Sequence, residues 1–535
     1  MTHQLIDNFL KMQKLLSFFR QYAFEWLLLI FSAGIPFALD MGPAFYGILG
    51  TFFIFLTLRR LSYWAFFAVF LFVLITCVLF LPQIIWFGHP PATMIGAFFE
   101  TDWQESKEFV QSLPLYSYAF SLLTLLFGGY ILYLGKKKTY PHNRKQSIIT
   151  LVIGVLAIGL TLYRPLAKIK ELQAFKWSVS RTAIVAFYAS IYDNIQEYQT
   201  MKRELSKGIE GTPTWQISKA KPLYQNYVLV IGESVRKDYM HLYGFPENNT
   251  PFLDKAYGTI IDGYTATAPN TTTSLLRSFV QMKGEKDFVY INNIITLAKT
   301  AGFETFWFSN QGISGNWDTP IAKLAFLCDH KEFTKKGDYA SMNYHDSILL
   351  SLLERALQQK SHKPRLFILH TMGSHVNFEA RLEHSIHFDY YNRKLSAYIQ
   401  TIEQTDTLLK GIYDALQQQG VPFSMLYFSD HGLMTQDRGS MFASLTHGDT
   451  NPNKACYRVP FVLLSSDDTE HKVLKVNKSA FHFLDGFAHW LGIEEASLRP
   501  NYSFLSPQND TLKVFNQYEN VPFEGLEEDK IITNE

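Results

Sequence analysis

Long apolar runs fill the first third of the chain, and shorter ones recur through the remainder. A helix needs about 20 mostly apolar residues to cross the hydrocarbon core of a bilayer. Five runs have this character, and we predict that each forms a membrane-spanning helix. They cover residues 23–39, 43–58, 62–86, 115–135 and 147–164. Because the second and fifth runs are short, three or six crossings also fit the pattern.

Positive charges lie between alternate apolar runs. Lys and Arg occur in the N-terminal segment, at Arg59 and Arg60 and in the loop 136–145, whereas the turn 40–43 has neither. Lys and Arg are held back on the cytoplasmic side of a membrane. We therefore expect a cytoplasmic N-terminus and, after five crossings, a chain that lies outside the cytoplasm beyond residue 165. No small-residue cleavage site follows the first run, which favours a retained anchor over a signal peptide.

This pattern divides the chain into three parts. We predict a transmembrane domain with an external loop at 87–114, an amphipathic linker on the membrane surface, and a domain outside the cytoplasm, over residues 1–165, 166–222 and 223–535. The external loop contains Thr101 and Glu105, which share one face if this segment is helical. The segment is then either an interfacial helix anchored by its aromatic residues or a contact for substrate.

Beyond residue 223, apolar runs of strand length alternate with helical patterns. Strands are expected at 226–232, 303–309, 364–370, 423–429 and 459–465. Helices are expected at 271–282, 289–301, 342–359, 389–419 and 478–491. Apolar Val, Leu, Ile and Phe runs that alternate with helices are typical of a buried sheet covered on both faces. The fold class is therefore α/β, with a mixed, mostly parallel sheet.

Side chains that can bind a metal ion or take part in catalysis follow three of these strands. Glu233 follows the first, His370 and His375 end and follow the third, and Asp430 and His431 follow the fourth. Sheets of this kind place their sites beyond the carboxyl ends of the strands. One strand-end Glu is more often a solvated or capping residue than a ligand. Three strand ends with oxygen and nitrogen donors together favour a metal site.

A run of hydroxyls offers a nucleophile. Residues 268–277 indicate a loop that ends at Pro269 and a helix that begins near Asn270 or Thr271. A helix N-terminus stabilises phosphate and a developing alkoxide. The hydroxyls could instead be caps, although one cap needs only one of the four in a row.

The donor set favours zinc as the metal. Ligation by Asp, His, Glu and a hydroxyl suits zinc better than magnesium, and manganese also fits. Metal coordination makes a hydroxyl far easier to deprotonate, as it does for zinc-bound water.

The net charge and the cysteine content limit the kinds of partner and site that the chain can have. The net charge of +1 gives no indication of a nucleic-acid partner. Cys77, Cys328 and Cys456 form no CxxC pair, so they provide neither a disulfide framework nor a cysteine metal site. A bridge between Cys328 and Cys456 is compatible with an oxidising compartment, but the sequence gives no geometry for it.

The motifs taken together resemble those of phosphoethanolamine transferases of the lipid A and lipopolysaccharide-core type, in the alkaline phosphatase and sulfatase superfamily. The resemblance covers essentially the whole chain. The motifs are Val-Ile-Gly-Glu-Ser at 230–234, Tyr-Gly-Phe-Pro-Glu-Asn-Asn-Thr-Pro at 243–251, Asn-Thr-Thr-Thr-Ser at 270–274, His-Thr-Met-Gly-Ser-His at 370–375, Ser-Asp-His-Gly at 429–432, Thr-His-Gly at 446–448 and Arg-Val-Pro at 458–460.

The resemblance implies an alkaline-phosphatase-like domain and assigns roles to its residues. One Zn²⁺ would be held by Glu233, Thr271, Asp430 and His431. Thr271 would be the nucleophile, with Thr272 as the alternative register. Two further histidines would bind the substrate phosphate or a second zinc, and one of them would protonate the leaving group; they are His375 and His447. Thr101 and Glu105 would contact substrate.

The sequence departs from the family pattern outside this set. The segment 310–316 offers no lysine where many relatives have one, Leu433 replaces a common Glu, and Ala97 replaces an Asn. The extra disulfides of the lipid A enzymes are also missing. These differences favour a branch other than the lipid A enzymes.

The expected activity is transfer of phosphoethanolamine from phosphatidylethanolamine to an envelope glycan or glycolipid. The acceptor could be lipid A phosphate, core heptose, a periplasmic glucan or a protein. We expect a monomer in the bacterial inner membrane with a periplasmic catalytic domain. Phosphoglycerol transfer is the alternative activity, and a catalytically silent membrane sensor is the alternative class. A sulfatase is disfavoured because no Cys/Ser-x-Pro-x-Arg segment is present.

Overall fold

The structure is a computed structural model of the 535-residue chain. It describes residues 17, 20–90, 94–95, 98–99, 103–140, 143–172, 174–285, 287–312, 320–335, 344–448 and 451–533. The chain forms two compact units. The helical unit comprises residues 1–95 and 113–198, and the α/β unit comprises residues 96–112 and 199–535.

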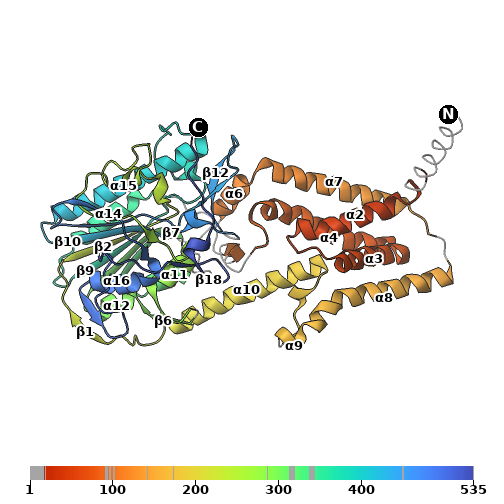
Figure 1. Ribbon diagram of the computed structural model, residues 1–535, viewed down its shortest axis with the longest axis horizontal. Coiled ribbons are helices and arrows are strands. Elements are labelled where there is room, and N and C mark those ends of the chain that lie inside the picture. The colour runs from red at the N-terminus through yellow and green to blue at the C-terminus, as the bar shows by residue number, and fades with distance from the viewer. Residues whose placement is uncertain are drawn as a thin grey trace. The chain divides into compact units, whose positions relative to one another are not determined.

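The helical unit contains a helix at each of the five predicted apolar runs (Figure 1). They are α2 (Ala23–Ala38), α3 (Phe45–Leu61), α4 (Tyr63–Phe87), α7 (Leu115–Lys137) and α8 (Arg144–Ala167). Among the described residues, α4, α7 and α8 are long and apolar enough to cross a membrane, and α2 is a shorter apolar helix. The positions of the helices are confirmed, and the number of crossings stays a prediction.

Small residues allow these helices to approach closely. A Cβ atom on Gly128 of α7 would lie 2.4 Å from Leu74 Cδ1 of α4. A Cβ atom on Gly154 of α8 would lie 2.8 Å from Thr57 Cγ2 of α3. Close approach of small residues is the usual way in which helices pack in a bilayer, where apolar burial gives no net drive.

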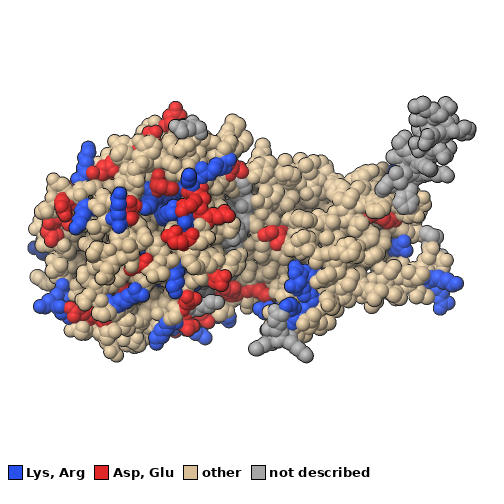
Figure 2. Space-filling view, viewed as in Figure 1, with Lys and Arg blue, Asp and Glu red and all other residues tan. Residues whose placement is uncertain are grey.

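Two helices that are close in sequence to the helices of the helical unit belong wholly or partly to the α/β unit. The helix α6 (Trp103–Ser112) lies in the segment predicted as an external loop. The helix α10 (Ala183–Gly208) lies in the predicted linker, and the chain passes from one unit to the other between Tyr198 and Gln199. Figure 2 shows Lys, Arg, Asp and Glu interspersed over the visible face of the α/β unit, whereas few charged side chains lie on the visible face of the helical unit.

An eight-stranded mixed sheet forms the centre of the α/β unit, in the order β14-β3-β13-β10-β2-β9-β7-β8. The five strands β10, β2, β9, β7 and β8 are parallel, and β13 is antiparallel to β10. The bounds are β2 (Asn226–Gly232), β3 (Gly258–Ile261), β7 (Glu304–Gly312), β8 (His330–Lys335), β9 (Arg365–His370), β10 (Phe423–Ser429), β13 (Phe461–Ser465) and β14 (His471–Leu474). The five predicted strands and the mostly parallel sheet are confirmed.

Helices cover both faces of this sheet (Figure 1). Along β2, Leu229 and Ile231 pack in one hydrophobic cluster while Val228 and Val230 pack in the other. The first cluster includes α11 (Thr271–Phe279), α12 (Ile294–Thr300), α13 (Pro320–Ala325) and α16 (Phe483–Trp490). The second includes α14 (Ser347–Leu357) and α15 (Arg393–Gln418). Successive side chains of a strand point to opposite faces, so a strand buried on both faces is apolar throughout.

Three predicted helices include residues that form strands instead. The helix predicted at 478–491 starts only with α16 at Phe483, and its first residues form β15 (Lys478–Ser479). Residues expected to be helical at 280–282 and 289–293 instead form β5 (Val280–Lys283) and β6 (Asp287–Asn293), which pair antiparallel. Val289, Tyr290 and Ile291 are β-branched or aromatic and favour an extended chain. The helix α12 starts only after Asn293, whose side chain accepts hydrogen bonds from the backbone of Ile295 and Thr296.

Cys77, Cys328 and Cys456 are all buried thiols. No disulfide joins Cys328 to Cys456 in the structure, so the bridge considered from the sequence is not formed.

Candidate metal centre

Three parallel strands end at the candidate site. Gly232 pairs with Ser429, and Ile231 pairs with His370, so the strands β2, β10 and β9 stop at the same level. Glu233 and Asp430 are each the first residue beyond such a strand. The register of the sheet therefore places two carboxylates side by side, as the strand-end rule predicts.

Glu233, Asp430 and His431 form a buried cluster, and none of the three is exposed to solvent. His431 Nε2 lies 3.3 Å from Glu233 Oε1 and 3.7 Å from Asp430 Oδ2. One ligand atom of each residue lies within 4.8 Å of the other two. His431 Nδ1 is 2.7 Å from the carbonyl oxygen of Gly432, which fixes the ring with Nε2 toward the carboxylates.

Thr271 brings a hydroxyl to this cluster from the first residue of α11. Its Oγ1 donates to Glu233 Oε2 at 2.8 Å and lies 3.4 Å from His431 Nε2. Asn270 is the cap of the helix, because its side-chain oxygen accepts from the backbone N–H of Thr273 at 3.1 Å. The Thr271 hydroxyl is therefore not needed as the cap.

His375 and His447 lie beside the cluster. The ring centroids of His447 and His431 are 5.0 Å apart, and those of His447 and His375 are 5.5 Å apart. Burial, followed by the charges of His431 and His375, holds the pKa of His447 well below its usual range. A neutral imidazole can bind a metal ion or exchange a proton with a substrate.

The charges of the cluster depend strongly on one another. Burial alone would raise the pKa of Glu233, but the hydrogen bond and charge of His431 hold it well below its usual range. Burial and the charge of Glu233 raise the pKa of Asp430. Burial opposes protonation of His431, while Asp430 and Glu233 outweigh it and raise its pKa. Two carboxylates this close need a positive charge between them, from a proton or a cation.

The donor atoms fit a zinc ion. Asp430 Oδ2 is buried and accepts no hydrogen bond within the described part of the chain. Its other oxygen accepts from the backbone N–H groups of Ser234 and His431 at 3.1 and 2.7 Å. Two carboxylates, an imidazole Nε2 and a hydroxyl are a donor set that zinc accepts.

Comparison with known proteins identifies the family. The Sulfatase family model matches residues 225–493. The phosphoethanolamine transferase OpgE of Escherichia coli is 34% identical over 424 residues, which is 78% of this chain and 79% of OpgE. The chain belongs to the phosphoethanolamine transferase family.

Solved structures of the family share the fold of this transferase. The integral membrane protein lipooligosaccharide phosphoethanolamine transferase A (EptA) of Neisseria meningitidis has a TM-score of 0.55 at 17% identity, covering 89% of this chain and 96% of EptA. The C-terminal periplasmic domain of EptC of Escherichia coli, in complex with Zn, has a TM-score of 0.51 at 20% identity, covering 59% of this chain and 96% of that domain. The resemblance inferred from the motifs is thus confirmed for the family and for both parts of the fold.

The transferase site contains three polar side chains that sequence reasoning did not assign. Gln311 Nε2 donates to Glu233 Oε2 at 3.1 Å and to the carbonyl oxygen of Thr371 at 3.0 Å. Ser234 Oγ donates to Glu233 Oε1 at 2.7 Å from a left-handed backbone with φ of 62°. Asp346 accepts from the backbone N–H groups of Met372 and Gly373 and so holds the loop that leads to His375. Of these three residues, only Gln311 was indicated by the sequence, because it lies in the segment 310–316, where many relatives have a lysine.

The predicted substrate contacts in the external loop are not tested. Thr101 and Ala97 lie outside the described residues. Glu105 lies in α6, and its side chain is not described.

Proposed function

We propose that this transferase moves phosphoethanolamine from phosphatidylethanolamine to an envelope glycan or glycolipid through a covalent intermediate on Thr271. The observation that carries the proposal is the position of Thr271 Oγ1, which binds Glu233 at 2.8 Å from the first turn of α11. A nucleophilic hydroxyl needs a group that favours its ionised form and a positive environment for the phosphoryl oxygens. The Glu233 cluster offers the group that favours ionisation, and the N-terminal end of α11 offers the positive environment.

Zinc is the proposed cofactor, held by Glu233, Thr271, Asp430 and His431. A second zinc would fit beside His375 and His447. The bare oxygen of Asp430 and the solved EptC domain in complex with Zn both support this choice. When bound, zinc would lower the pKa of the Thr271 hydroxyl by withdrawing electron density from it.

The first step transfers the group to the protein. Thr271 Oγ1 loses its proton to solvent water and forms a bond to phosphorus, and the bond from phosphorus to the diacylglycerol oxygen breaks. The proton that this oxygen needs to leave as diacylglycerol comes from the protonated form of His375, with His447 as the alternative acid.

The second step releases the group. A hydroxyl or phosphate of the acceptor forms a bond to phosphorus, the bond from phosphorus to Thr271 Oγ1 breaks, and the threonine oxygen takes a proton back from solvent water. The histidine that gave a proton in the first step accepts one from an acceptor hydroxyl in the second.

The membrane helices suit a lipid donor, because diacylglycerol stays in the bilayer after the first step. We propose that the chain is a monomer in the bacterial inner membrane, with five crossings, a cytoplasmic N-terminus and a periplasmic α/β unit. Thr101 and Glu105 of the external loop would contact the substrate. The match to family members over most of the chain supports this setting.

The test compares variants of two adjacent threonines. Each variant is placed in lipid nanodiscs with fluorescently labelled phosphatidylethanolamine, and diacylglycerol release is measured. Thr271→Ala should lower diacylglycerol release at least about 1,000-fold, as loss of a nucleophile does. Thr272→Ala, in the same helical turn, should stay within about threefold of the unchanged protein. Mass spectrometry of the intact protein should show one phosphoethanolamine group on the unchanged protein and none on Thr271→Ala. The reverse order of the two variants would move the nucleophile to Thr272.

The same assay separates the rival activity. Phosphatidylglycerol in place of phosphatidylethanolamine should release no diacylglycerol. Release from phosphatidylglycerol alone would show a phosphoglycerol transferase, and release from neither lipid, with stoichiometric zinc absent, would support a sensor.

A further inference from the structure

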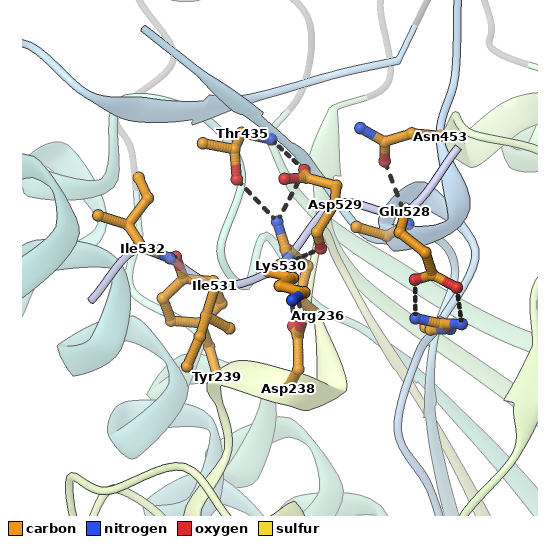
Figure 3. A network of polar contacts seen from close by, with 12 residues as sticks. Arg236, Asp238, Tyr239, Thr435, Asn453, Glu528, Asp529, Lys530, Ile531 and Ile532 are labelled. Atoms are coloured by element: carbon orange, nitrogen blue, oxygen red, sulfur yellow. Dashed lines mark hydrogen bonds and ion pairs between the residues drawn. The ribbon is translucent and has the colours of Figure 1, made fainter. Parts of the chain in front are cut away.

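The last described stretch of the chain binds the loops that carry the predicted metal ligands (Figure 3). We call residues 527–532 the C-terminal strap. Its partners belong to three loops, which follow Glu233, His431 and His447 in sequence. The strap itself contributes no residue to the ligand cluster.

The first loop is bound through Arg236, a fully buried arginine. Its Nη1 donates to Asp529 Oδ2 at 3.2 Å and its Nη2 donates to the carbonyl oxygen of Asp529 at 3.0 Å. Asp238 pairs with the same guanidinium at 2.7 Å. Since Arg236 lies in the same loop as Glu233, the strap holds the backbone that leads away from this ligand.

The second loop, which includes the short strand β11 (Met434–Gln436), is bound through Thr435 and Arg438. The backbone N–H of Thr435 donates to Asp529 Oδ2, and Arg438 Nη2 donates to Asp529 Oδ1 at 2.6 Å. Arg438 also donates to the carbonyl oxygens of Lys530 and Ile531. One aspartate therefore joins the loop after Glu233 to the loop after His431.

The third loop is bound through Lys454 and Arg458. Arg458 forms a bidentate pair with Glu528, with distances of 2.7 and 2.9 Å. Lys454 Nζ donates to Glu528 at 2.9 Å, and its backbone N–H donates to the carbonyl oxygen of Glu527 at 2.9 Å. This loop touches the second one directly, because Gly432 N–H donates to the carbonyl oxygen of Cys456 at 2.8 Å.

The end of the strap is anchored in the core. Ile532 is buried, and its backbone N–H donates to Tyr239 Oη at 2.9 Å. The Tyr239 ring packs edge-on against Tyr398, with centroids 5.5 Å apart. Tyr398 Oη in turn accepts from Arg236 N and donates to the carbonyl oxygen of Ser234, both at 2.9 Å. Contacts thus run continuously from the strap to the residue beside Glu233.

Ion pairs of two strap carboxylates, Asp529 and Glu528, strengthen the binding of the strap. The buried guanidinium of Arg236 is shared between Asp238 and Asp529, so loss of the Asp529 charge leaves it with one carboxylate partner in place of two, which is unfavourable for a buried charge. Burial opposes ionisation of Asp529, but the charge of Arg236 holds its pKa below the usual range. Hydrogen bonds from Arg458 and Lys454 lower the pKa of Glu528 to about 2. Both carboxylates therefore stay ionised at neutral pH.

We propose that the C-terminal strap positions the metal centre, with Asp529 and Arg236 as positioning residues that hold the loops of Glu233, His431 and His447 in one arrangement. The inference rests on the proposed function, because it assigns the strap to the same zinc-binding site. Ligands that come from separate loops bind a metal well only if their supporting contacts fix them in place.

The test uses Asp529→Asn in the full-length protein, with Lys530→Ala as the matched control in the same strap. The Lys530 side chain has no partner among the described contacts, so this control changes the strap without changing the network. Loss of such supporting contacts typically costs 10- to 100-fold in metal affinity or activity. We expect Asp529→Asn to weaken zinc affinity about tenfold, measured by competition with a chromophoric chelator, and Lys530→Ala to leave it unchanged. Asp529→Glu, which keeps the charge, should recover part of the loss.

Two further readouts separate positioning from general stability. In the assay with phosphatidylethanolamine, Asp529→Asn should lower kcat about tenfold and leave KM within about twofold. Hydrogen exchange in metal-free protein should become faster in the loops after Glu233 and His431 but stay unchanged in β2 and β10. A lower melting temperature with unchanged zinc affinity and unchanged kcat at 25 °C would overturn the proposal.

A milder full-length variant, Arg438→Gln, covers the case in which Asp529→Asn fails to fold. The Arg438 side chain is half exposed, and its removal takes away hydrogen bonds to Asp529, Lys530 and Ile531 while the buried pair of Arg236 and Asp529 stays. Folded Arg438→Gln should bind zinc more weakly than Lys530→Ala, and equal zinc affinity of these two variants would overturn the proposal. Zinc affinity needs no substrate, so failure of the strap can be distinguished from failure of the proposed transfer reaction.

Discussion

Gln311 shows how one side chain can tune the proposed nucleophile. Its amide donates to the same oxygen of Glu233 that accepts from Thr271, at 3.1 and 2.8 Å respectively. This oxygen therefore receives two hydrogen bonds, and each donor limits the position of the other. A hydrogen bond to a charged group contributes about 1.5–3 kcal/mol.

Replacement of Gln311 should accordingly weaken catalysis without removing it. We expect Gln311→Ala to lower kcat/KM about tenfold, which corresponds to about 1.4 kcal/mol of lost transition-state stabilisation. Gln358→Ala, at an exposed glutamine that ends α14, is the matched control and should have no effect. The measurement is diacylglycerol release from phosphatidylethanolamine at matched zinc content. Equal rates for the two variants would show that the amide does not influence the site.

The residues of the site differ in how readily the sequence reveals them. The grouping of Glu233, Asp430 and His431 could be predicted because Glu233 and the pair Asp430-His431 come directly after apolar strands, and parallel strands bring such residues to one edge. Thr271 could be predicted because a helix starts there. Gln311, Ser234 and Asp346 could not, because their roles depend on partners that are far away in sequence and on one left-handed backbone position.

At the scale of elements, the buried side chain of Asp406 connects α15 to the segment that contains Phe252 and Leu253. Asp406 accepts from the backbone N–H groups of Phe252 and Leu253 at 2.8 and 3.0 Å. Burial raises the pKa of Asp406 to about 6, although these two hydrogen bonds oppose the change. The ordinary value is 3.8, so the folded protein keeps this proton to a higher pH than the unfolded chain does.

Stability should therefore fall as the pH rises from about 4 to about 6 and then level off, as far as Asp406 is concerned. In this window the unfolded chain has already lost the proton, while the folded protein still binds it. The difference in pKa corresponds to roughly 3 kcal/mol at most. Asp406→Asn should show a flatter change of melting temperature between pH 4.5 and 7.5 than the unchanged protein. Parallel curves for the two proteins would contradict the raised pKa of Asp406. A uniformly lower melting temperature of the variant would not contradict it, because the variant loses one hydrogen-bond acceptor.

Elements differ in predictability for reasons of length and context. The central strands are long and apolar on both faces, so β2, β9 and β10 were predicted nearly residue for residue. The edge strand β8 contains two lysines, a histidine and a glutamate, and a solvated edge needs no apolar pattern. The β5–β6 hairpin was mistaken for helix because a short apolar run fits either period, and only pairing with another segment decides between them.

At the scale of the whole molecule, the position of the α/β unit relative to the bilayer decides whether the proposed chemistry has access to periplasmic acceptors. Cations at Arg59, Arg60, Lys136, Lys137 and Lys138 lie at the ends of α3 and α7. The positive-inside rule predicts that these ends lie in the cytoplasm. An odd number of crossings then puts everything after α8 on the other side.

Reporter fusions test this topology. A green fluorescent protein fused at the N-terminus or after Tyr140 should fluoresce, because it folds in the cytoplasm. An alkaline phosphatase fused after Leu113 or at the C-terminus should be active, because it needs the oxidising periplasm for its disulfides. Replacement of Lys136, Lys137 and Lys138 by Gln should weaken the retention of this loop and lower fluorescence from the fusion after Tyr140. An inactive phosphatase at the C-terminus would mean an even number of crossings and a cytoplasmic α/β unit, and transfer to a periplasmic acceptor would then be excluded whatever the geometry of Thr271 and Glu233.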